Sequence, residues 1–391
     1  MNKYLFTSES VSHGHPDKVC DQISDLILDL YLAKDPNAKV AAEAVAAFNK
    51  VFISGEIGSK VKISNSEIEE EVRNLIKKIG YTKGSFAADT VEIEIRLNKQ
   101  SEDINIGVDK IDPKDQGAGD QGIMFGFASN NSENYMPASI AYAHKILQTV
   151  LAKNTLNLGP DAKSQITFEY QDDKPVRLDT VLLSIQHPEN VSIEDVKFEC
   201  KPIIEKLFPK SLINNQTKFL FNPTGRFTIG GPEGDVGLTG RKIIVDTYGG
   251  YATHGGGAFS GKDPSKVDRS ATYMARYLAK NIVASGLADK CLIQLSYAIG
   301  VAKPISIFVN FYNTGKIAES KVVDFINNNI DLSPYGIITK LDLKRPIYQQ
   351  TSTYGHFGRN ADDYEGFNWE RLDLVEDFAA LMSPVDLAAT N

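Results

Sequence analysis

Apolar and polar positions along the first hundred residues predict a fixed order of strands and helices. Apolar residues recur three and four apart where a helix is expected, and they alternate with charged residues where a strand has one buried face. Pro16 suits the first turn of the first helix, and Gly80 suits the end of the second. The predicted order is β-α-β-β-α-β, with strands at Tyr4–Val11, Val40–Phe48, Val51–Ile57 and Val91–Leu97 and helices from Pro16 to Asp35 and from Ser64 or Asn65 to Gly80.

The same order of elements returns twice further along the chain. The second set comprises strands at Ile123–Ala128, Gln165–Tyr170, Val176–Gln186 and Lys218–Phe221 and helices over Ala138–Leu151 and Ile193–Leu207. The third comprises strands at Ile243–Tyr248, Leu292–Gly300 and Ile305–Tyr312 and helices over Ser265–Ser285 and Glu319–Asn328. The pattern predicts an α+β fold of three similar units, each a sheet covered by two helices. We expect the units at 1–101, 114–231 and 233–391, with no element assigned after Asp331.

Composition narrows the functional classes. The 391 residues include 42 Lys and Arg against 50 Asp and Glu, for a formal net charge of -8, so nothing favours nucleic acid or an anionic membrane as a partner. No stretch approaches the roughly 18 apolar residues of a membrane span. Three widely spaced cysteines fit buried free thiols better than disulfides or a zinc site. We therefore expect a soluble, cytoplasmic protein.

Glycine is concentrated in one part of the chain. Twelve of the 30 glycines lie within residues 225–261, where several cationic side chains also occur. Some of these glycines mark ordinary tight turns. Glycine-rich backbone mixed with cations also suits a polyphosphate, because N–H groups can approach it closely and the cations neutralise it.

Two nucleotide-binding patterns match only in part. Residues 117–122 fit GxGxxG, but they lead into a predicted strand and not into a helix, which excludes the dinucleotide-binding motif. Residues 256–262 resemble the start of a P-loop, but Asp263 stands where Ser or Thr should hold magnesium. A phosphate-binding loop fits the second segment, whereas a standard P-loop NTPase does not.

The segment Glu9–Lys18 places Glu, His, Asp and Lys at a predicted strand-to-helix junction. A helix N-terminus attracts anions, and Asp17 there suits a magnesium ion that bridges to phosphate. Taken alone, Asp17 is more simply a helix-start carboxylate, and His15 is more simply structural.

Several longer strings change that balance because they occur together and in order. They are Thr7–Lys18, Asp115–Gly126, Pro160–Thr167, Asn222–Pro232, Gly237–Gly250, His254–Arg269 and Tyr354–Arg359. In these strings the chain resembles the methionine adenosyltransferase family, from about Leu5 to Arg359.

This resemblance implies a fold of three similar units around a pseudo-threefold axis, with the chain crossing between units. It implies S-adenosylmethionine synthesis: the sulfur of methionine attacks C5′ of ATP, and the released tripolyphosphate is cleaved to phosphate and diphosphate. It also implies a dimer with interfacial active sites, often paired into a tetramer, and a mobile gate loop over 100–116.

The resemblance also assigns residue roles by their position in the motifs. His15 stabilises the leaving oxygen, and it acts in catalysis with the cations Lys163, Arg241, Lys262 and Lys266. ATP contacts add Asp161, Phe227, Asp235 and Lys242. Methionine contacts are Glu56, Gln100, Asp120, Asp235 and Lys266. Asp17 and Asp268 match ligands of two Mg²⁺ ions, and Glu43 matches a carboxylate at a K⁺ site.

Two other functions fit parts of the pattern. A phosphotransferase would use the same phosphate-binding residues but would form ADP. A non-catalytic nucleotide-binding protein predicts loss of the key charges, and these are present.

Overall fold

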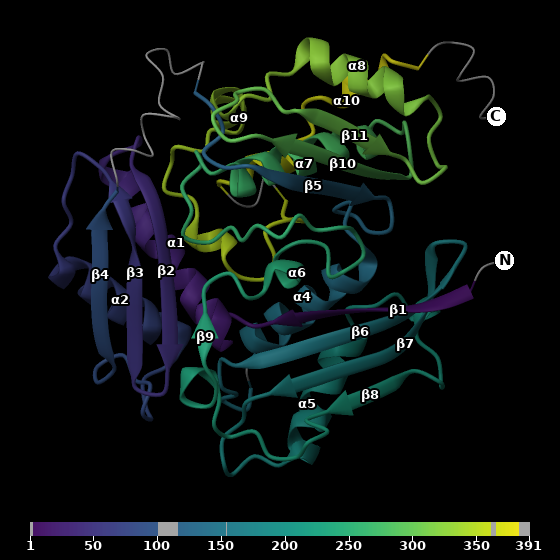
Figure 1. Ribbon diagram of the computed structural model, residues 1–391. Coiled ribbons are helices and arrows are strands. Elements are labelled where there is room, and N and C mark those ends of the chain that lie inside the picture. The colour runs from purple at the N-terminus through teal and green to yellow at the C-terminus, as the bar shows by residue number, and fades with distance from the viewer. Residues whose placement is uncertain (1–2, 101–115, 154, 361–364, 383–391) are drawn as a thin grey trace.

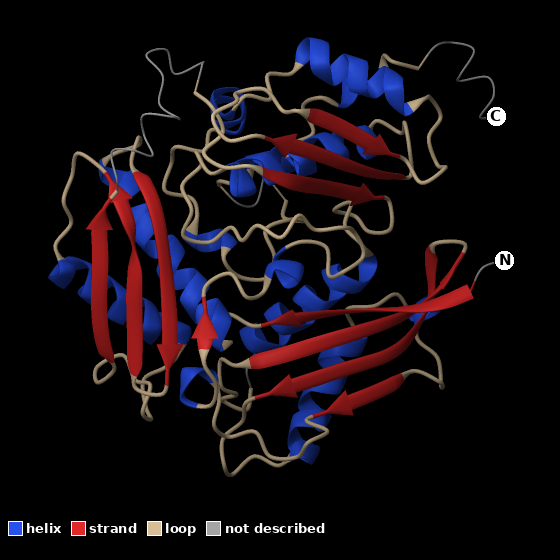
Figure 2. Cartoon of the chain, viewed as in Figure 1, coloured by secondary structure: helices blue, strands red, loops and turns tan. Residues whose placement is uncertain are grey.

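The computed structural model describes residues 3–100, 116–153, 155–360 and 365–382, and it has an α+β fold with three sheets arranged around a common centre (Figure 1). Helices pack against each of the three sheets (Figure 2). The predicted fold class is confirmed.

The first helix of the first set lies deep inside the molecule. In α1 (Pro16–Lys34), every residue from Pro16 to Leu28 is buried, including the charged ones. The long helix of the third set, α7 (Val267–Ala284), is buried from Val267 to Val283 except at Asp268. Helices buried on all sides serve as central supports, and their charged residues must find partners inside the protein.

Each sheet is built from neighbouring strands and one strand from elsewhere in the chain. The first sheet contains β2 (Lys39–Ala47), β3 (Lys50–Gly58), β4 (Glu92–Lys99) and the short β9 (Gly237–Leu238). The second contains β1 (Lys3–Val11), β6 (Ala162–Gln171), β7 (Lys174–Ile185) and β8 (Lys218–Phe221). The third contains β5 (Gly122–Ser129), β10 (Lys290–Tyr297) and β11 (Ser306–Asn310).

The strands from elsewhere follow one rule. β1 joins the second sheet, β5 joins the third, and β9 joins the first. Each pairs antiparallel with the strand that follows the first long helix of the set it joins, namely β6, β10 and β2. The first strand of each set therefore pairs with a strand of another set and not of its own, and these three pairings link the sheets to one another.

The remaining helices agree closely with the sequence pattern. Ser64 caps α2 (Asn65–Ile79) by accepting a hydrogen bond from the Glu67 N–H at 3.2 Å, and Gly80 ends it in the left-handed conformation. The other long helices are α4 (Ala138–Lys153), α5 (Ile193–Glu205) and α8 (Glu319–Asn329). Cys20, Cys200 and Cys291 are free and buried, as predicted. In the described ranges no helix is both long and apolar enough to span a membrane.

One predicted strand is wrong. Residues 243–248 contain the short helix α6 (Ile243–Asp246), in which the Asp246 N–H donates to the Lys242 carbonyl at 2.9 Å. A short apolar run fits either element by periodicity, and here tertiary contacts decide, because the buried Asp246 pairs with Lys18 of α1. β9 and not residues 243–248 is therefore the first strand of the third set.

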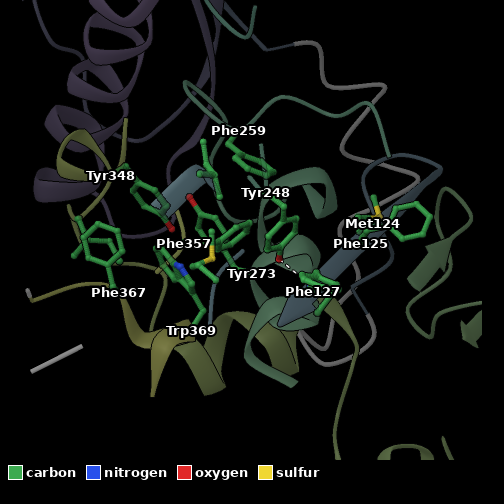
Figure 3. Close-up of a cluster of buried hydrophobic side chains, with 14 of the residues drawn as sticks. Met124, Phe125, Phe127, Tyr248, Phe259, Tyr273, Tyr348, Phe357, Phe367 and Trp369 are labelled. Atoms are coloured by element: carbon green, nitrogen blue, oxygen red, sulfur yellow. Dashed lines mark hydrogen bonds between the residues drawn. The ribbon is translucent and has the colours of Figure 1, made fainter. Parts of the chain in front are cut away.

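The C-terminal segment, to which the sequence assigned no elements, packs its aromatic rings against α7. It contains α9 (Pro334–Leu341) and α10 (Val375–Ala379). Trp369 stacks on Tyr273 of α7 with 3.7 Å between ring centroids, and Phe357 stacks on Tyr248 at 5.1 Å (Figure 3). This segment completes the core around α7.

Candidate active site

A first group of charged side chains surrounds the start of α1. Lys242 donates to one carboxylate oxygen of Asp17 at 2.5 Å, and the Leu238 N–H donates to the other at 2.9 Å. Arg241 lies 3.7 Å from the same carboxylate. Burial raises the pKa of Asp17, but the hydrogen bonds from Lys242 and Leu238 outweigh it, so the pKa falls below its ordinary value. Asp17 is therefore an anion held between two cations.

His15 is the N-cap of α1 and is almost completely buried. Its Nδ1 accepts a hydrogen bond from the Asp17 N–H at 3.1 Å. Burial, together with the charges of Lys242 and Lys163, lowers the pKa of His15 to about 3. The ring is therefore neutral near pH 7, and since Nδ1 accepts, we assign its proton to Nε2. The result is a neutral hydrogen-bond donor beside a carboxylate and cations.

The strand β6 and the residue just before it supply two more of the predicted residues. Lys163 on β6 is exposed and lies opposite Val11 of β1, at the end of the strand that leads into α1. Asp161 accepts from the Gly231 N–H at 2.8 Å through one oxygen, and its other oxygen is buried with no hydrogen-bond partner in the part of the chain that the structure describes. Burial raises the pKa of Asp161 to about 6.

Phe227 and Asp235 lie on the glycine-rich segment that follows β8. The Phe227 N–H donates to Nε2 of His187 at 3.1 Å, and the His187 N–H donates back to the Phe227 carbonyl at 2.9 Å. These two bonds fix the backbone that presents the Phe227 ring. Asp235 is exposed, and one of its carboxylate oxygens accepts from the Val236 N–H at 2.9 Å.

A second charged group lies at the start of α7. Lys262 donates to Asp268 at 2.6 Å, while Lys266 pairs with Asp263. Asp263 also accepts from the Val40 N–H of β2 at 2.8 Å and is buried. Both groups thus place a lysine–aspartate pair at the N-terminus of a buried helix.

Four predicted residues lie apart from both groups. Glu43 on β2 and Glu56 on β3 are exposed, on the face of the sheet opposite the buried side of β2 that packs on α1. The Gln100 side-chain oxygen is buried and has no hydrogen-bond partner among the described residues, and Asp120 is exposed. No hydrogen bond or ion pair between described residues joins these four to His15 or Lys262.

The structure also reveals charged residues that the sequence reasoning passed over. Asp21 and Asp25 are buried on α1, one and two turns beyond Asp17. Asp21 pairs with Lys18 at 3.0 Å, and Asp25 pairs with Arg269 at 2.7 Å. The signal that would have found them is the repetition of aspartate every fourth residue along a helix whose other residues are mostly apolar.

The carboxylates of Asp17 and Asp268 suit one mode of Mg²⁺ binding, in which the ion is held partly by phosphate. Among the described residues, no three or more His, Cys, Asp or Glu side chains gather as a metal cluster. Mg²⁺ is commonly held by one or two carboxylates, with phosphate and water oxygens as its other ligands. Asp17 and Asp268, each a single hard-oxygen ligand among lysines, fit an ion that arrives with a polyphosphate.

Comparison with known proteins identifies the family. Residues 3–102, 115–227 and 229–371 match the N-terminal, central and C-terminal domains of S-adenosylmethionine synthetase, respectively. S-adenosylmethionine synthase 2 of Rhodospirillum rubrum is 52% identical over 378 residues, which cover 96% of this chain and 97% of that protein. S-adenosylmethionine synthase of a Bradyrhizobium species is 53% identical over 390 residues, covering 96% and 98%. With the resemblance seen in the motifs thereby confirmed, the chain belongs to the S-adenosylmethionine synthetase family.

Proposed function

We propose that this protein makes S-adenosylmethionine, phosphate and diphosphate from ATP, L-methionine and water. The sulfur of methionine attacks C5′ of ATP, tripolyphosphate leaves, and the protein then hydrolyses it. Beyond family membership, one observation carries the proposal: a buried, neutral His15 stands beside the Asp17–Lys242 pair, and its Nε2–H donates to none of the described residues.

That arrangement suits the chemistry at C5′. As the C5′–O5′ bond breaks, negative charge grows on O5′, and a fixed donor aimed at that oxygen lowers the barrier. His15 fills this role as a neutral donor that needs no proton from solvent. The transfer also forms a sulfonium cation, so catalysis rests on positioning and on stabilising the leaving group.

The cations of the site would bind the tripolyphosphate. We assign Lys163, Lys242, Lys262 and Lys266 as point charges and Arg241 as a bidentate ligand of the phosphates. Two of them are paired with the proposed Mg²⁺ ligands, Lys242 with Asp17 and Lys262 with Asp268. Mg²⁺ bound through these aspartates and the phosphates would neutralise the leaving group further. Two Mg²⁺ ions per site match the two carboxylates.

Two buried acceptors that have no partner among the described residues support the substrate assignments. The free oxygen of Gln100 suits the ammonium group of methionine, beside Glu56 and Asp120. The free oxygen of Asp161 suits a hydroxyl or amino group of ATP. We assign the Phe227 ring to stacking on adenine, and Asp235 to contacts with both substrates.

We infer that each active site is shared by two chains of a dimer. Glu56 and Glu43 point away from α1, whereas His15 and Asp17 lie at its start, so one chain presents these sets on different sides of the first sheet. Exposed apolar side chains on the strands, such as Leu5, Leu220 and Phe308, favour self-association. Pairing of two dimers into a tetramer remains a prediction.

Three further assignments remain predictions. The exposed Glu43 carboxylate would contribute to a K⁺ site. The gate loop predicted over 100–116 lies outside the described residues except at Gln100 and Gln116. We expect the protein to work in the cytoplasm, in keeping with its three free thiols.

The products distinguish this reaction from phosphoryl transfer. Purified protein is incubated with ATP, methionine, Mg²⁺ and K⁺, and phosphorus NMR and chromatography identify the products. We expect S-adenosylmethionine with equal amounts of phosphate and diphosphate. The alternative, a phosphotransferase that uses the same phosphate-binding residues, predicts ADP, and its appearance would refute adenosyl transfer. The family comparison does not favour that alternative.

A further inference from the structure

The helix α1 carries aspartates at every fourth position from its first turn to its fourth, so these side chains lie on one face. The first three are at most 1% exposed. Asp17, Asp21, Asp25 and Asp29 accept backbone N–H hydrogen bonds from Leu238, Gly240, Gly261 and Tyr348, in that order, at 2.8–2.9 Å. Three separate segments of the chain are therefore fastened to one face of one helix.

Two of these bonds hold the glycine-rich segments that carry the proposed phosphate ligands. Gly240, which binds Asp21, directly precedes Arg241 and Lys242. Gly261, which binds Asp25, directly precedes Lys262. Gly261 has φ +81°, and a Cβ there would lie 1.9 Å from the Ala42 carbonyl oxygen, so the segment passes against β2 at a fixed point.

Through its ion pair with Arg269, Asp25 is also connected to both residues of the Lys262–Asp268 pair. The guanidinium of Arg269 makes two hydrogen bonds to Asp25, at 2.7 and 3.0 Å. Arg269 is also the residue that directly follows Asp268 in the chain. It also donates to the carbonyls of Phe259 and Lys262, at 3.0 and 3.2 Å. Both partners of the Lys262–Asp268 pair are thus next to groups that the Asp25–Arg269 pair fixes.

The helix also sets the spacing between the two charged groups. Asp17 and Asp25 are eight residues apart, which corresponds to about 12 Å along a helix that rises 1.5 Å per residue. A rigid, buried helix keeps that spacing better than two loops would keep it by themselves.

We propose that Asp21 and Asp25 are positioning residues that hold the two polyphosphate-binding segments at a fixed spacing along α1. The inference rests on the proposed function, because it takes Arg241, Lys242, Lys262 and Asp268 as ligands of the phosphates and their Mg²⁺. Neither aspartate touches substrate in this account. Partners that orient ligands in this way commonly contribute about 10–100-fold to affinity.

Calorimetric titration of the whole protein with tripolyphosphate, supplied as its hydrolysis-resistant imido analogue, and Mg²⁺ tests the proposal without turnover. Asp21→Asn is the first variant, because Lys18 keeps Asp246 as its partner when Asp21 loses its charge. The second is the double variant Asp25→Asn with Arg269→Gln, which avoids leaving a buried arginine without a counterion. Glu370→Gln is the matched control: this equally buried carboxylate pairs with Arg276 of α7 and touches none of the proposed ligands.

We expect both test variants, folded by circular dichroism, to bind tripolyphosphate at least about tenfold more weakly, with the control unchanged. Folded test variants with parental affinity would overturn the inference, as would an equal loss in Glu370→Gln. If the double variant does not fold, Asp21→Asn decides. Failure of the unmodified protein to bind tripolyphosphate would instead refute the proposed function.

Discussion

The three sets of elements place equivalent helices, α1, α4 and α7, at corresponding points of the fold, but the helices begin differently. The second residue is Asp17 in α1 and Asp268 in α7, each paired with a lysine. In α4 it is Ser139, which is buried and hydrogen-bonds to Ser8 at 2.7 Å, and the first turn of α4 carries no acidic residue. The backbone design is shared, whereas the charge is not.

The difference separates what the repeated architecture does from what its residues do. A helix N-terminus favours anions wherever it lies, but a site for a polyphosphate also needs cations and a metal ligand. α1 and α7 supply them, and α4 uses the same position to pack against β1. The repeated arrangement of elements therefore accounts for the fold. The charged residues present at two of the three helix starts account for the proposed chemistry.

The largest loss of activity should come from substitution of His15, the histidine that caps the N-terminus of α1. His15→Ala should reduce S-adenosylmethionine formation by about a thousandfold, because the leaving oxygen loses its fixed donor. Hydrolysis of added tripolyphosphate should be retained, since it needs the cations and not this donor. Both rates are measured on the same preparation, and an equal fall in both would show that His15 has a structural or phosphate-binding role instead.

Substitution at the second helix position tests the comparison itself. Asp17→Asn and Asp268→Asn should each lower kcat by about a hundredfold and raise the Mg²⁺ concentration needed for half-maximal rate. Ser139→Ala, the matched change in α4, should leave the Mg²⁺ requirement as it is and reduce the free energy of unfolding by about 1 kcal/mol. Steady-state rates against Mg²⁺ and chemical denaturation measure the two effects. A shifted Mg²⁺ requirement in Ser139→Ala would contradict the distinction.

Mixing of inactive chains tests whether a site joins the start of α1 to the outer face of the first sheet of a partner chain. Chains with His15→Ala and chains with Glu56→Gln are denatured, mixed in equal amounts and refolded. Half of the resulting dimers are mixed, and one of their two sites is intact, so activity should recover to about a quarter of the unmodified level. No recovery above the separate variants would place both residues of a site on one chain.

The smallest effect concerns pH near the α1 group. The pKa of Asp161 is raised to about 6, so the folded protein binds this proton more tightly than the unfolded chain does. Its contribution to stability is present below about pH 4 and is lost as the pH rises through about 6. Asp161→Asn should therefore show a weaker fall in unfolding free energy between pH 4.5 and 7, measured by urea denaturation. Identical pH slopes in the two proteins would contradict the shift.

Local rules predicted much of the fold. Capping residues placed α2 within a residue at each end, and alternation identified β4. The pairing of β1 with β6 of the second sheet could not be predicted from local patterns, because strand pairing over more than 150 residues leaves no mark in local periodicity. The run at 243–248 was assigned to the wrong element because short apolar runs fit both periods.

The site divides in the same way. Motifs identified His15, Asp17 and Lys262, which lie in charged groups at the starts of two helices. They did not single out Asp21 and Asp25, because charged residues on a helix ordinarily mark its solvent face. Only the packing of α1 on all sides shows that these carboxylates are buried and paired.

The most direct test of adenosyl transfer follows the oxygen that His15 is proposed to stabilise. ATP labelled with oxygen-18 at the position joining C5′ to the α-phosphate is converted with methionine, and mass spectrometry locates the label. Attack at C5′ predicts that the label leaves with the phosphate and diphosphate and is absent from the nucleoside product. Retention of the label on the nucleoside would show that a phosphorus–oxygen bond had broken, which would contradict the account.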